Sequence, residues 1–411
     1  MKRIAVVGGG VSGLSAAHFL KDRFQVKVFE KETKVGGLIR CKRVDGSLFH
    51  ICGGHVFNSK RQDVLEWFWS FFDKNLEFVK TDRNSSVFMG EGLYVPYPIE
   101  NHVYFLSKDI QESFIEDLLE ISKTGNAPQN FEEFLTMRFG KTLYDLYFKP
   151  YNEKVWRRDL RQVPLSWLEG KLPMPTVQEM IYNNMNHIEE KSFVHSTFFY
   201  EKDKGSQFIA DRLASGLDIS CDINVESIEF VDDGFLVNGE KFDKVVFCGN
   251  IKQLPILIKN FDIEGFVKPI DSLEYHGTTS VFCEIDKNPY SWIYLPDKKT
   301  EAHRIICTGN FSESNNAIGK MTATVEFTDF MDKNDIEAEL KKTPLNPKYL
   351  DHHYNEYTYP IQDHRTKDLI RSLKMKLQNR GFYFTGRFAD WEYYNMDIAM
   401  GVSMDICKMI E

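Results

Sequence analysis

The 411-residue sequence lacks the features that mark several common classes of protein. No apolar run approaches the roughly 18 residues that a membrane-spanning helix requires. Lys and Arg number 51 against 60 Asp and Glu, a net charge of −9, so the positive field that attracts nucleic acid or an anionic membrane is missing. We therefore predict no nucleic-acid partner and no membrane span.

Cysteine is sparse, and its spacing follows no pattern. The seven residues lack the paired spacing of zinc ligands, and the N-terminus lacks a cationic and apolar leader. We expect a reduced, cytoplasmic protein without disulfides and without a metal. No Ser-His-Asp set and no pair of carboxylates stands out either.

The N-terminal segment has the pattern of a βαβ unit. A short apolar run at Ile4–Val7 predicts a buried parallel strand, because it shows no polar alternation. A helix is predicted at about Ser12–Lys21 and a second strand at Val26–Glu30. Such a unit is where dinucleotides bind in doubly wound folds.

The glycines between this strand and helix support the same interpretation. Gly8, Gly10 and Gly13 have the spacing that allows a tight turn, close approach of a pyrophosphate and close packing of the helix. Glu30 ends the second strand, where it would bind a ribose hydroxyl and repel a 2′-phosphate. A glycine-rich turn can also be purely structural, so the triplet alone leaves that alternative open.

The segment after Glu30 favours FAD over NAD by resemblance. The run Lys31–Leu38 resembles the extension of the glutathione-reductase-type flavoproteins, whose paired glycines pass close to the flavin's ribityl and phosphate groups. Thr385-Gly386-Arg387 is similar to the late strand that returns to that cofactor. The resemblance implies these FAD contacts: Gly8, Gly10, Ser12, Gly13, Glu30, Lys31, Gly37, Leu38 and Arg387.

The length and the order of the patterns predict an α/β protein with interleaved domains. A Rossmann-like, discontinuous FAD-binding domain is expected at residues 1–80, 205–250 and 355–411. A mainly helical domain with a mobile lid is expected at 81–190, and an antiparallel-sheet substrate domain at 191–204 and 251–354.

Further segments resemble the UDP-galactopyranose mutase family, most closely its eukaryotic-type members. They occur in the family's order along nearly the whole chain, which argues against coincidence. The segments are GGHVF at 53–57, VPYPIEN at 95–101, KPYNEKVW at 149–156, WLEGK at 167–171, WIY at 292–294, RIICTGNFS at 304–312, YTYPI at 357–361 and GRFADWEYYNMD at 386–397.

The resemblance implies roles for single residues. Gly54 and His55 would lie against the flavin near N5, and Asn395, Met396 and Asp397 would face its pyrimidine ring from the start of the last helix. The implied catalytic residues are His55, Arg304 and Lys171. The implied substrate contacts are Tyr97, Tyr151, Asn152, Trp156, Lys171, Trp292, Tyr294, Arg304, Tyr359, Tyr393 and Asn395.

The family's chemistry would make the protein an isomerase. The resemblance implies a flavin-dependent exchange of a nucleotide-diphosphate sugar, a UDP-hexose first, between its pyranose and furanose forms, as in galactofuranose formation for polysaccharide biosynthesis. Reduced FAD would attack the anomeric carbon through N5, expel the nucleotide diphosphate and take it back without net redox change. An external reductant such as NAD(P)H is then a candidate partner.

Two other functions stay open at this point. An FAD-dependent oxidoreductase of the amine oxidase or desaturase kind shares the FAD fold, but its apolar or cationic substrates would leave Lys171, Arg304 and the tyrosines without an anion. A flavin-binding protein without catalysis is the third interpretation. Structural alternatives also exist for the residues: a satisfied core histidine for His55, a solvated side chain for Lys171 and an ion pair for Arg304.

The sequence leaves the substrate's identity open. Glu100 stands where eukaryotic-type members have Gln near the uracil edge, and a carboxylate accepts but does not donate hydrogen bonds. Lys171 stands where the family usually has Arg, and lysine lacks the bidentate fork. A base other than uracil and an N-acetylated or deoxy hexose both remain candidates, and the oligomeric state is not predicted.

Overall fold

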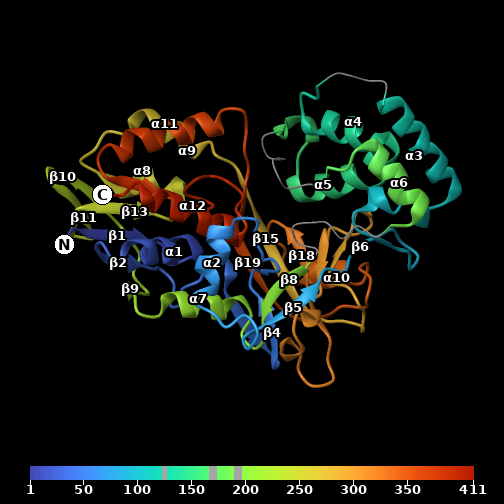
Figure 1. Cartoon of the computed structure of the whole chain (residues 1–411), viewed down its shortest axis with the longest axis horizontal. Helices are drawn as coiled ribbons and strands as arrows, with labels where there is room; N and C mark the ends of the chain where they lie inside the picture. Colours follow the sequence, from blue (N-terminus) through green and yellow to red (C-terminus); the bar gives the residue numbers. More distant parts are fainter. Residues whose placement is uncertain (123–126, 166–173, 189–196) are drawn as a thin grey trace.

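The computed structural model describes residues 1–122, 127–165, 174–188 and 197–411. Figure 1 shows a lobe that holds both chain termini, a sheet in the middle and a group of helices at the far end. Within the described ranges, no helix combines the length and the apolar character needed to cross a bilayer.

The lobe with the termini is built on a five-stranded parallel sheet. Its elements are β1 (Arg3–Val7), α1 (Val11–Leu20), β2 (Gln25–Phe29), α7 (Ser206–Ala214), β9 (Asp218–Ser220), β13 (Lys244–Phe247), α11 (Thr366–Gln378), β20 (Phe382–Phe384) and α12 (Met396–Lys408). The strand order is β20-β13-β1-β2-β9, and every neighbouring pair is parallel. One face packs on α1 and α12 and the other on α11, so the strands are apolar on both faces.

A four-stranded sheet and two short helices complete this lobe. They are β10 (Ile228–Val231), β11 (Gly234–Val237), β12 (Glu240–Phe242), β14 (Ile258–Lys259), α8 (Leu254–Leu257) and α9 (Glu264–Asp271). Residues 251–273 were expected in the substrate domain, but Ile251, Leu254 and Ile270 lie in one core with Val245 and Phe382. The parallel-sheet lobe therefore extends past residue 250, where the expected FAD-binding segment ended.

A seven-stranded sheet forms the middle of the molecule. It contains β6 (Ser85–Phe88), β7 (Tyr94–Pro96), β15 (Tyr275–Glu284), β16 (Trp292–Tyr294), β17 (Arg304–Ile306), β18 (Thr322–Thr328) and β19 (Lys348–Pro360), with α10 (Lys333–Leu340) packed on it. The order is β19-β15-β18-β17-β16-β6-β7, antiparallel except for the parallel pair β16 and β6. Strands β6 and β7 were expected in the helical domain, but they belong to this sheet. Strand β19 continues past residue 355, where the FAD-binding domain was expected to resume.

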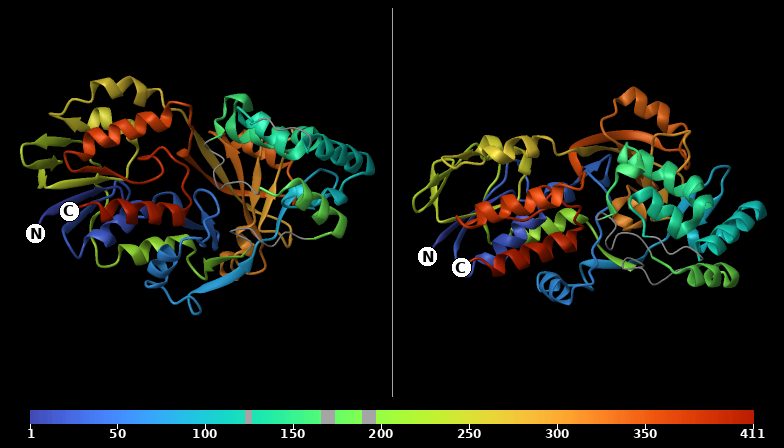
Figure 2. Two further views of the ribbon diagram at one scale, coloured as in Figure 1. Left: turned by 45° about the horizontal axis from the view of Figure 1, so that its top comes forward. Right: turned by 90° about the horizontal axis from the view of Figure 1, so that it is seen from above.

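The helical domain lies at the end of this sheet that is far from the termini, as both views of Figure 2 show. It contains α3 (Lys108–Ile121), α4 (Phe131–Leu143), a π-helical turn at Tyr144–Phe148, α5 (Lys149–Trp156) and α6 (Val177–Asn186). Their apolar side chains form one core with Val87 and Val95 of the sheet. The helices are thus packed directly on β6 and β7.

Smaller elements connect the two sheets. These are β3 (Cys41–Val44) paired with β4 (Ser47–His50), α2 (Gln62–Trp69), and β5 (Phe78–Asp82) paired with β8 (Thr197–Glu201). Strand β4 lies against β18 of the seven-stranded sheet, and α2 packs on α1 and α12, so between β4 and α2 the chain returns to the parallel-sheet lobe.

Candidate active site

The glycine loop after β1 has the geometry that its spacing predicts. Gly8 turns the chain at φ +108°, a conformation that favours glycine. A Cβ atom on Gly13 would lie 1.9 Å from the Gly8 carbonyl oxygen. Only glycine at position 13 lets α1 pack this closely on the turn.

The first turn of α1 is free to bind an anion. Its N-cap residue, Gly10, has no side chain to accept from the first amides, and the first turn contains no acidic residue. Backbone N–H groups at such a helix N-terminus attract phosphate. The loop and the helix therefore fit the pyrophosphate of a dinucleotide.

Glu30 lies directly beside this loop. Its side chain is buried and accepts hydrogen bonds from Gly9 N–H at 2.7 Å and Glu32 N–H at 2.9 Å, one on each oxygen. A carboxylate has about four acceptor positions, so each oxygen keeps capacity for a ribose hydroxyl. Lys31, by contrast, is exposed and Leu38 half-buried on the segment after it.

The glycines after β2 run against the same loop. Gly36 N–H donates to the Gly9 carbonyl at 2.9 Å, and a Cβ on Gly37 would lie 3.3 Å from Gly10 Cα. Both glycines have positive φ, at +120° and +54°. The two glycine segments thus form one cradle of backbone.

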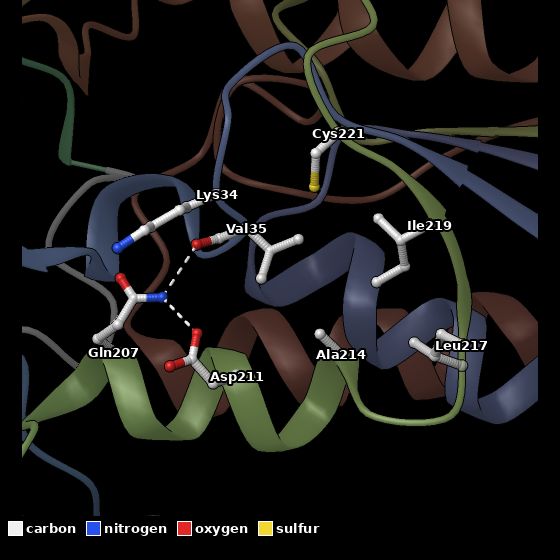
Figure 3. Close-up of a pocket in the computed structure, with 8 residues that line it drawn as sticks. All are labelled: Lys34, Val35, Gln207, Asp211, Ala214, Leu217, Ile219 and Cys221. Carbon is white, nitrogen blue, oxygen red and sulfur yellow. Dashed lines mark hydrogen bonds between the residues drawn. The ribbon is translucent and has the colours of Figure 1, made fainter.

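Gln207 on α7 fixes the position of this cradle, and the sequence analysis did not identify it. Its Nε2 donates to the Val35 carbonyl at 3.2 Å and to Asp211 at 2.8 Å (Figure 3). These bonds hold the chain one residue before Gly36. They border a surface hollow of about 380 Å³ between α7 and β9, separate from the aromatic cluster described below.

The Gly53–His55 segment lies against the seven-stranded sheet, between β4 and α2. Gly53 N–H donates to Glu326 at 2.9 Å, and a Cβ on Gly54 would lie 2.6 Å from the Ile306 side chain. His55 is half-buried, and its Nε2 atom is shielded from solvent without a hydrogen-bond partner among the described residues. Burial, with the nearby Arg387 guanidinium, lowers the pKa of His55 to about 4, so the ring is neutral.

A second histidine supports this segment from behind. His50 Nδ1 accepts from His55 N–H at 3.3 Å, and its Nε2 lies 2.8 Å from the Tyr200 hydroxyl. Burial and the neighbouring His55 lower the pKa of His50 to about 3. A neutral ring that accepts at Nδ1 must carry its proton on Nε2, so His50 donates to Tyr200.

The closing motif meets the glycine loop from the other side. Gly386 has φ +126°, and a Cβ there would lie 3.4 Å from Ser12 Oγ. Arg387 donates to the carbonyls of Thr358 at 3.1 Å and Tyr394 at 2.6 Å. Arg387 therefore joins the closing motif to β19.

Helix α12 begins beside this motif without a side-chain cap. Asn395 is its N-cap residue, exposed and making no capping bond, and Met396 and Asp397 form the first turn. Burial raises the pKa of Asp397. The uncapped amides, the orphaned His55 nitrogen and the glycine cradle together fit a flavin dinucleotide.

Arg304 and Glu326 form the charged centre of the other half of the site. They face each other across β17 and β18, where Arg304 Nε donates to Glu326 at 2.6 Å and Nη2 completes the ion pair. Burial alone would raise the pKa of Glu326, but the positive charge of Arg304 outweighs this effect and lowers the pKa to about 2. Glu326 in turn holds the pKa of Arg304 above its ordinary value against burial. The structural alternative for Arg304, an ion pair, is thus present.

The same arginine also reaches the late tyrosines. Arg304 Nη2 donates to the Tyr359 hydroxyl at 3.2 Å. The Tyr359 and Tyr393 rings stack with centroids 5.5 Å apart and an interplanar angle of 5°. Arg387 lies 4.5 Å from the centroid of the Tyr393 ring. The structure therefore brings together two arginines and two hydroxyls that the sequence analysis assigned to substrate and cofactor.

Three further tyrosines gather next to Arg304. Tyr294 is its direct partner across β16 and β17, and the Tyr97 and Tyr151 ring centroids lie 4.9 and 5.5 Å from that of Tyr294. Burial raises the pKa of both Tyr97 and Tyr151, so both hydroxyls are protonated at neutral pH. Arg83, which the sequence analysis missed, donates to the Tyr294 hydroxyl at 2.6 Å.

Four of the predicted substrate contacts remain to be placed: Asn152, Trp156, Trp292 and Lys171. Asn152 is buried and donates to the Phe148 carbonyl at 2.7 Å within the helical domain, and Trp156 is buried in the core of that domain. Trp292 lies under Arg83, whose guanidinium carbon is 4.9 Å from the ring centroid. Lys171 and the rest of its motif lie outside the described residues.

Comparisons with known proteins show what the chain is similar to. A family profile described as an NAD(P)-binding Rossmann-like domain matches residues 6–74. The UDP-galactopyranose mutase of Mycoplasma genitalium is 21% identical over 98% of this chain and 93% of its own length. The dTDP-fucopyranose mutase of Escherichia coli is 26% identical over 100% of this chain and 98% of its own length.

A solved structure shares the whole fold. Reduced UDP-galactopyranose mutase superimposes with a TM-score of 0.88 at 21% identity, covering 99% of this chain and 95% of its own. The predicted fold class, a Rossmann-like α/β domain with a helical and a largely antiparallel addition, is thereby confirmed. The similarity to eukaryotic-type members in particular stays a prediction. The chain is a homologue of the UDP-galactopyranose and dTDP-fucopyranose mutases.

Proposed function

We propose that this chain is a flavin-dependent isomerase that interconverts the pyranose and furanose forms of a nucleotide-diphosphate sugar. One observation carries the proposal. Arg304 and its tyrosines gather beside the Gly53–His55 segment, and the Glu326 carboxylate bonds to both. A site that recognises a diphosphate is therefore held next to a site that fits a flavin.

The cofactor residues follow from the geometry. The first-turn amides of α1 would bind the pyrophosphate of FAD, Glu30 its ribose, and the first turn of α12 its pyrimidine ring. Gly54 and the neutral His55 would border the reactive edge of the ring. When bound and reduced, the flavin supplies a nucleophile that can hold the anomeric carbon while the sugar ring opens and closes.

The protein's own part in the reaction is to hold the departing diphosphate and orient the sugar. Arg304 would bind the diphosphate with charge-assisted hydrogen bonds, each contributing about 1.5–3 kcal/mol. Three tyrosine hydroxyls would donate hydrogen bonds to the same diphosphate. Tyr294 is the cross-strand partner of Arg304, Tyr359 accepts a hydrogen bond from it, and Tyr393 stacks on Tyr359. Lys171, Tyr97, Tyr151, Asn152, Trp156 and Trp292 would complete the nucleotide pocket. Keeping the diphosphate in place lets it return to the anomeric carbon.

The amine oxidase or desaturase function fits the site less well. A cationic amine would meet the Arg83, Arg304 and Arg387 guanidinium groups, and a desaturase substrate would have to bury them against hydrocarbon. Three arginines around a cluster of tyrosines favour an anionic, polar substrate instead.

The reduced flavin would come from an external donor such as NAD(P)H. All seven cysteines are free thiols, which supports a reducing location such as the cytoplasm. The names of the relatives support UDP-galactose or dTDP-fucose as first substrates to try.

The proposal is tested by measuring isomerisation of a nucleotide sugar with the reduced protein and with the oxidised protein. Dithionite-reduced protein should convert UDP-galactopyranose or dTDP-fucopyranose to the furanose form, measured by chromatography, whereas air-oxidised protein should not. Arg304→Ala should raise the Kd for the nucleotide about 10-fold or more in protein that retains its flavin. Oxygen consumption with an amine, and no sugar isomerisation by the reduced protein, would reject the proposal.

A further inference from the structure

Arg304 does not bring a full positive charge to the site. Its Nε and Nη2 both bond to Glu326, which is ionised and 0% exposed. The pair is neutral as a whole, and a nucleotide diphosphate carries at least two negative charges. An acidic chain that binds such an anion needs a cation whose charge is not already compensated.

Arg83 provides such a charge. It lies between β5 and β6, half-buried, and no carboxylate lies within ion-pairing distance of it in the part of the chain that the structure describes. Its hydrogen-bond partners are both hydroxyls: Nε donates to Ser85 at 2.7 Å and Nη2 to Tyr294 at 2.6 Å.

Aromatic rings fix the plane of this guanidinium. Its central carbon lies 4.9 Å from the Trp292 ring centroid and 5.9 Å from that of Tyr97. Rings at these distances attract a guanidinium and limit its rotation without neutralising it. Arg83 is therefore oriented in advance, with Nη1 free of any hydrogen bond that the structure records.

The sheet places Arg83 and Arg304 on either side of Tyr294. Strand β16 pairs with β17 on one side, where Tyr294 faces Arg304, and with β6 on the other, where Trp292 faces Ser85. Arg83 comes two residues before Ser85, so it reaches Tyr294 from the β6 side. The Tyr294 hydroxyl bonds to Arg83, and the Arg304 guanidinium extends from the next strand.

We propose that Arg83 binds a phosphate of the nucleotide substrate directly and supplies an uncompensated positive charge to the site. The inference rests on the proposed function and extends it to a residue that no motif identified. In this arrangement, Arg83 holds the charge of the diphosphate, while Arg304 with Glu326 contributes directed hydrogen bonds.

The experiment is equilibrium binding of UDP and uridine to the flavin-loaded protein by titration calorimetry, with dTDP and thymidine in parallel. Arg83→Gln should weaken UDP or dTDP binding about 10- to 100-fold and change nucleoside binding less than about threefold. Arg83→Lys should fall in between, because lysine keeps the charge and loses the fork. Arg365→Gln is the matched control, since the Arg365 side chain is 88% exposed and pairs with its neighbour Asp363; its affinities should equal those of the wild type.

A double-mutant cycle separates direct contact from support of Tyr294. In a Tyr294→Phe background, Arg83→Gln should still weaken UDP binding, because the guanidinium itself meets the phosphate. No further loss in that background would mean that Arg83 only positions Tyr294 and would overturn the proposal. So would unchanged UDP affinity in Arg83→Gln or, if that variant fails to retain flavin, in Arg83→Lys.

Failure of the proposed function gives a different result. Wild-type protein that neither binds UDP or dTDP nor isomerises their sugars would reject the mutase function, and the Arg83 proposal with it. Wild-type protein that isomerises a nucleotide sugar, with an Arg83→Gln variant of equal UDP affinity, would reject the Arg83 proposal alone.

Discussion

At the scale of single residues, Glu326 connects the two halves of the site. One oxygen accepts from Gly53 N–H and the other from Arg304, and the residue is 0% exposed. A buried carboxylate is tolerated only when partners satisfy it, and its partner cation depends on it equally. Glu326 therefore matters for stability and for the geometry of the site together.

Glu326→Gln should destabilise the protein strongly. The amide keeps the size of the side chain but leaves the Arg304 charge buried without its counter-ion, a loss of about 3 kcal/mol or more in the free energy of unfolding. Urea unfolding of the two proteins measures it. The control is Glu284→Gln, which breaks the outer ion pair with Lys320 and should cost less than about 1 kcal/mol. Equal stability losses in the two variants would contradict the prediction.

The contribution of Glu326 should also depend on pH. Arg304 overcomes the effect of burial and lowers the Glu326 pKa from 4.5 to about 2. A carboxyl group whose pKa is lower in the folded state than in the unfolded state stabilises the fold. The stabilisation is complete above the pKa of the unfolded state and is lost as the pH falls through the pKa of the folded state. The stability difference between wild type and Glu326→Gln should therefore shrink by about 3 kcal/mol between pH 5 and pH 2. Urea titrations at several pH values measure this, and a constant difference would refute it.

At the scale of elements, the backbone of α1 packs directly on the backbone of the glycine loop that precedes it. A Cβ on Gly13 would overlap the Gly8 carbonyl oxygen at 1.9 Å. The clash involves main-chain atoms on both sides, which no side-chain rotation can relieve. The turn and the helix would have to separate, and the first-turn amides would move with them.

Gly13→Ala should therefore reduce flavin binding. We expect the purified variant to lose most of its FAD, measured by absorbance near 450 nm relative to protein. Gly265→Ala is the matched control, because a Cβ on Gly265 in α9 meets nothing within 4 Å. The control should keep its flavin and gain up to about 1 kcal/mol of stability, since alanine favours the helix. Full flavin content in Gly13→Ala would contradict the prediction.

Elements and contacts differ in how far sequence predicts them. The strand, glycine loop and helix at the N-terminus were predictable because their signals are local, and β1, α1 and β2 begin and end within about one residue of the prediction. The roles of Glu326 and Arg83 were not predictable from the sequence. They depend on the pairing of β17 with β18 and of β16 with β6, which no local sequence pattern encodes. Strands β6 and β7 were placed in the helical domain for the same reason: short strands gain their stability from distant partners.

At the scale of the whole molecule, Lys154 joins the helical domain to the seven-stranded sheet. It lies on α5, and its ammonium donates to the carbonyls of Leu295, Asp297 and Ala302 at 2.7, 2.6 and 3.0 Å. Burial lowers the pKa of Lys154 to about 8. The three carbonyls belong to the hairpin between Tyr294 and Arg304, so the helical domain holds the residues that would grip the substrate.

Lys154→Met should loosen this connection. Methionine fills the space but leaves three carbonyls without their donor, at a cost of about 2–4 kcal/mol in unfolding free energy. UDP affinity should fall as well, because the hairpin that carries Tyr294 and Arg304 loses its support. Lys149→Met, on the exposed side of the same helix, should change either quantity little. Urea unfolding and calorimetry measure both, and identical results for the two variants would exclude this role.

The shared carboxylate of Glu326 makes the two ligands energetically dependent on each other. An anion that draws Arg304 toward itself weakens the bond that Glu326 makes on that side and changes the charge felt next to Gly53. Coupling between two binding events is reciprocal. If reduction of the flavin changes the affinity for the nucleotide by some factor, binding of the nucleotide changes the redox equilibrium of the flavin by the same factor. A tenfold preference of UDP for the reduced protein would therefore appear as a midpoint potential raised by about 30 mV when UDP is bound.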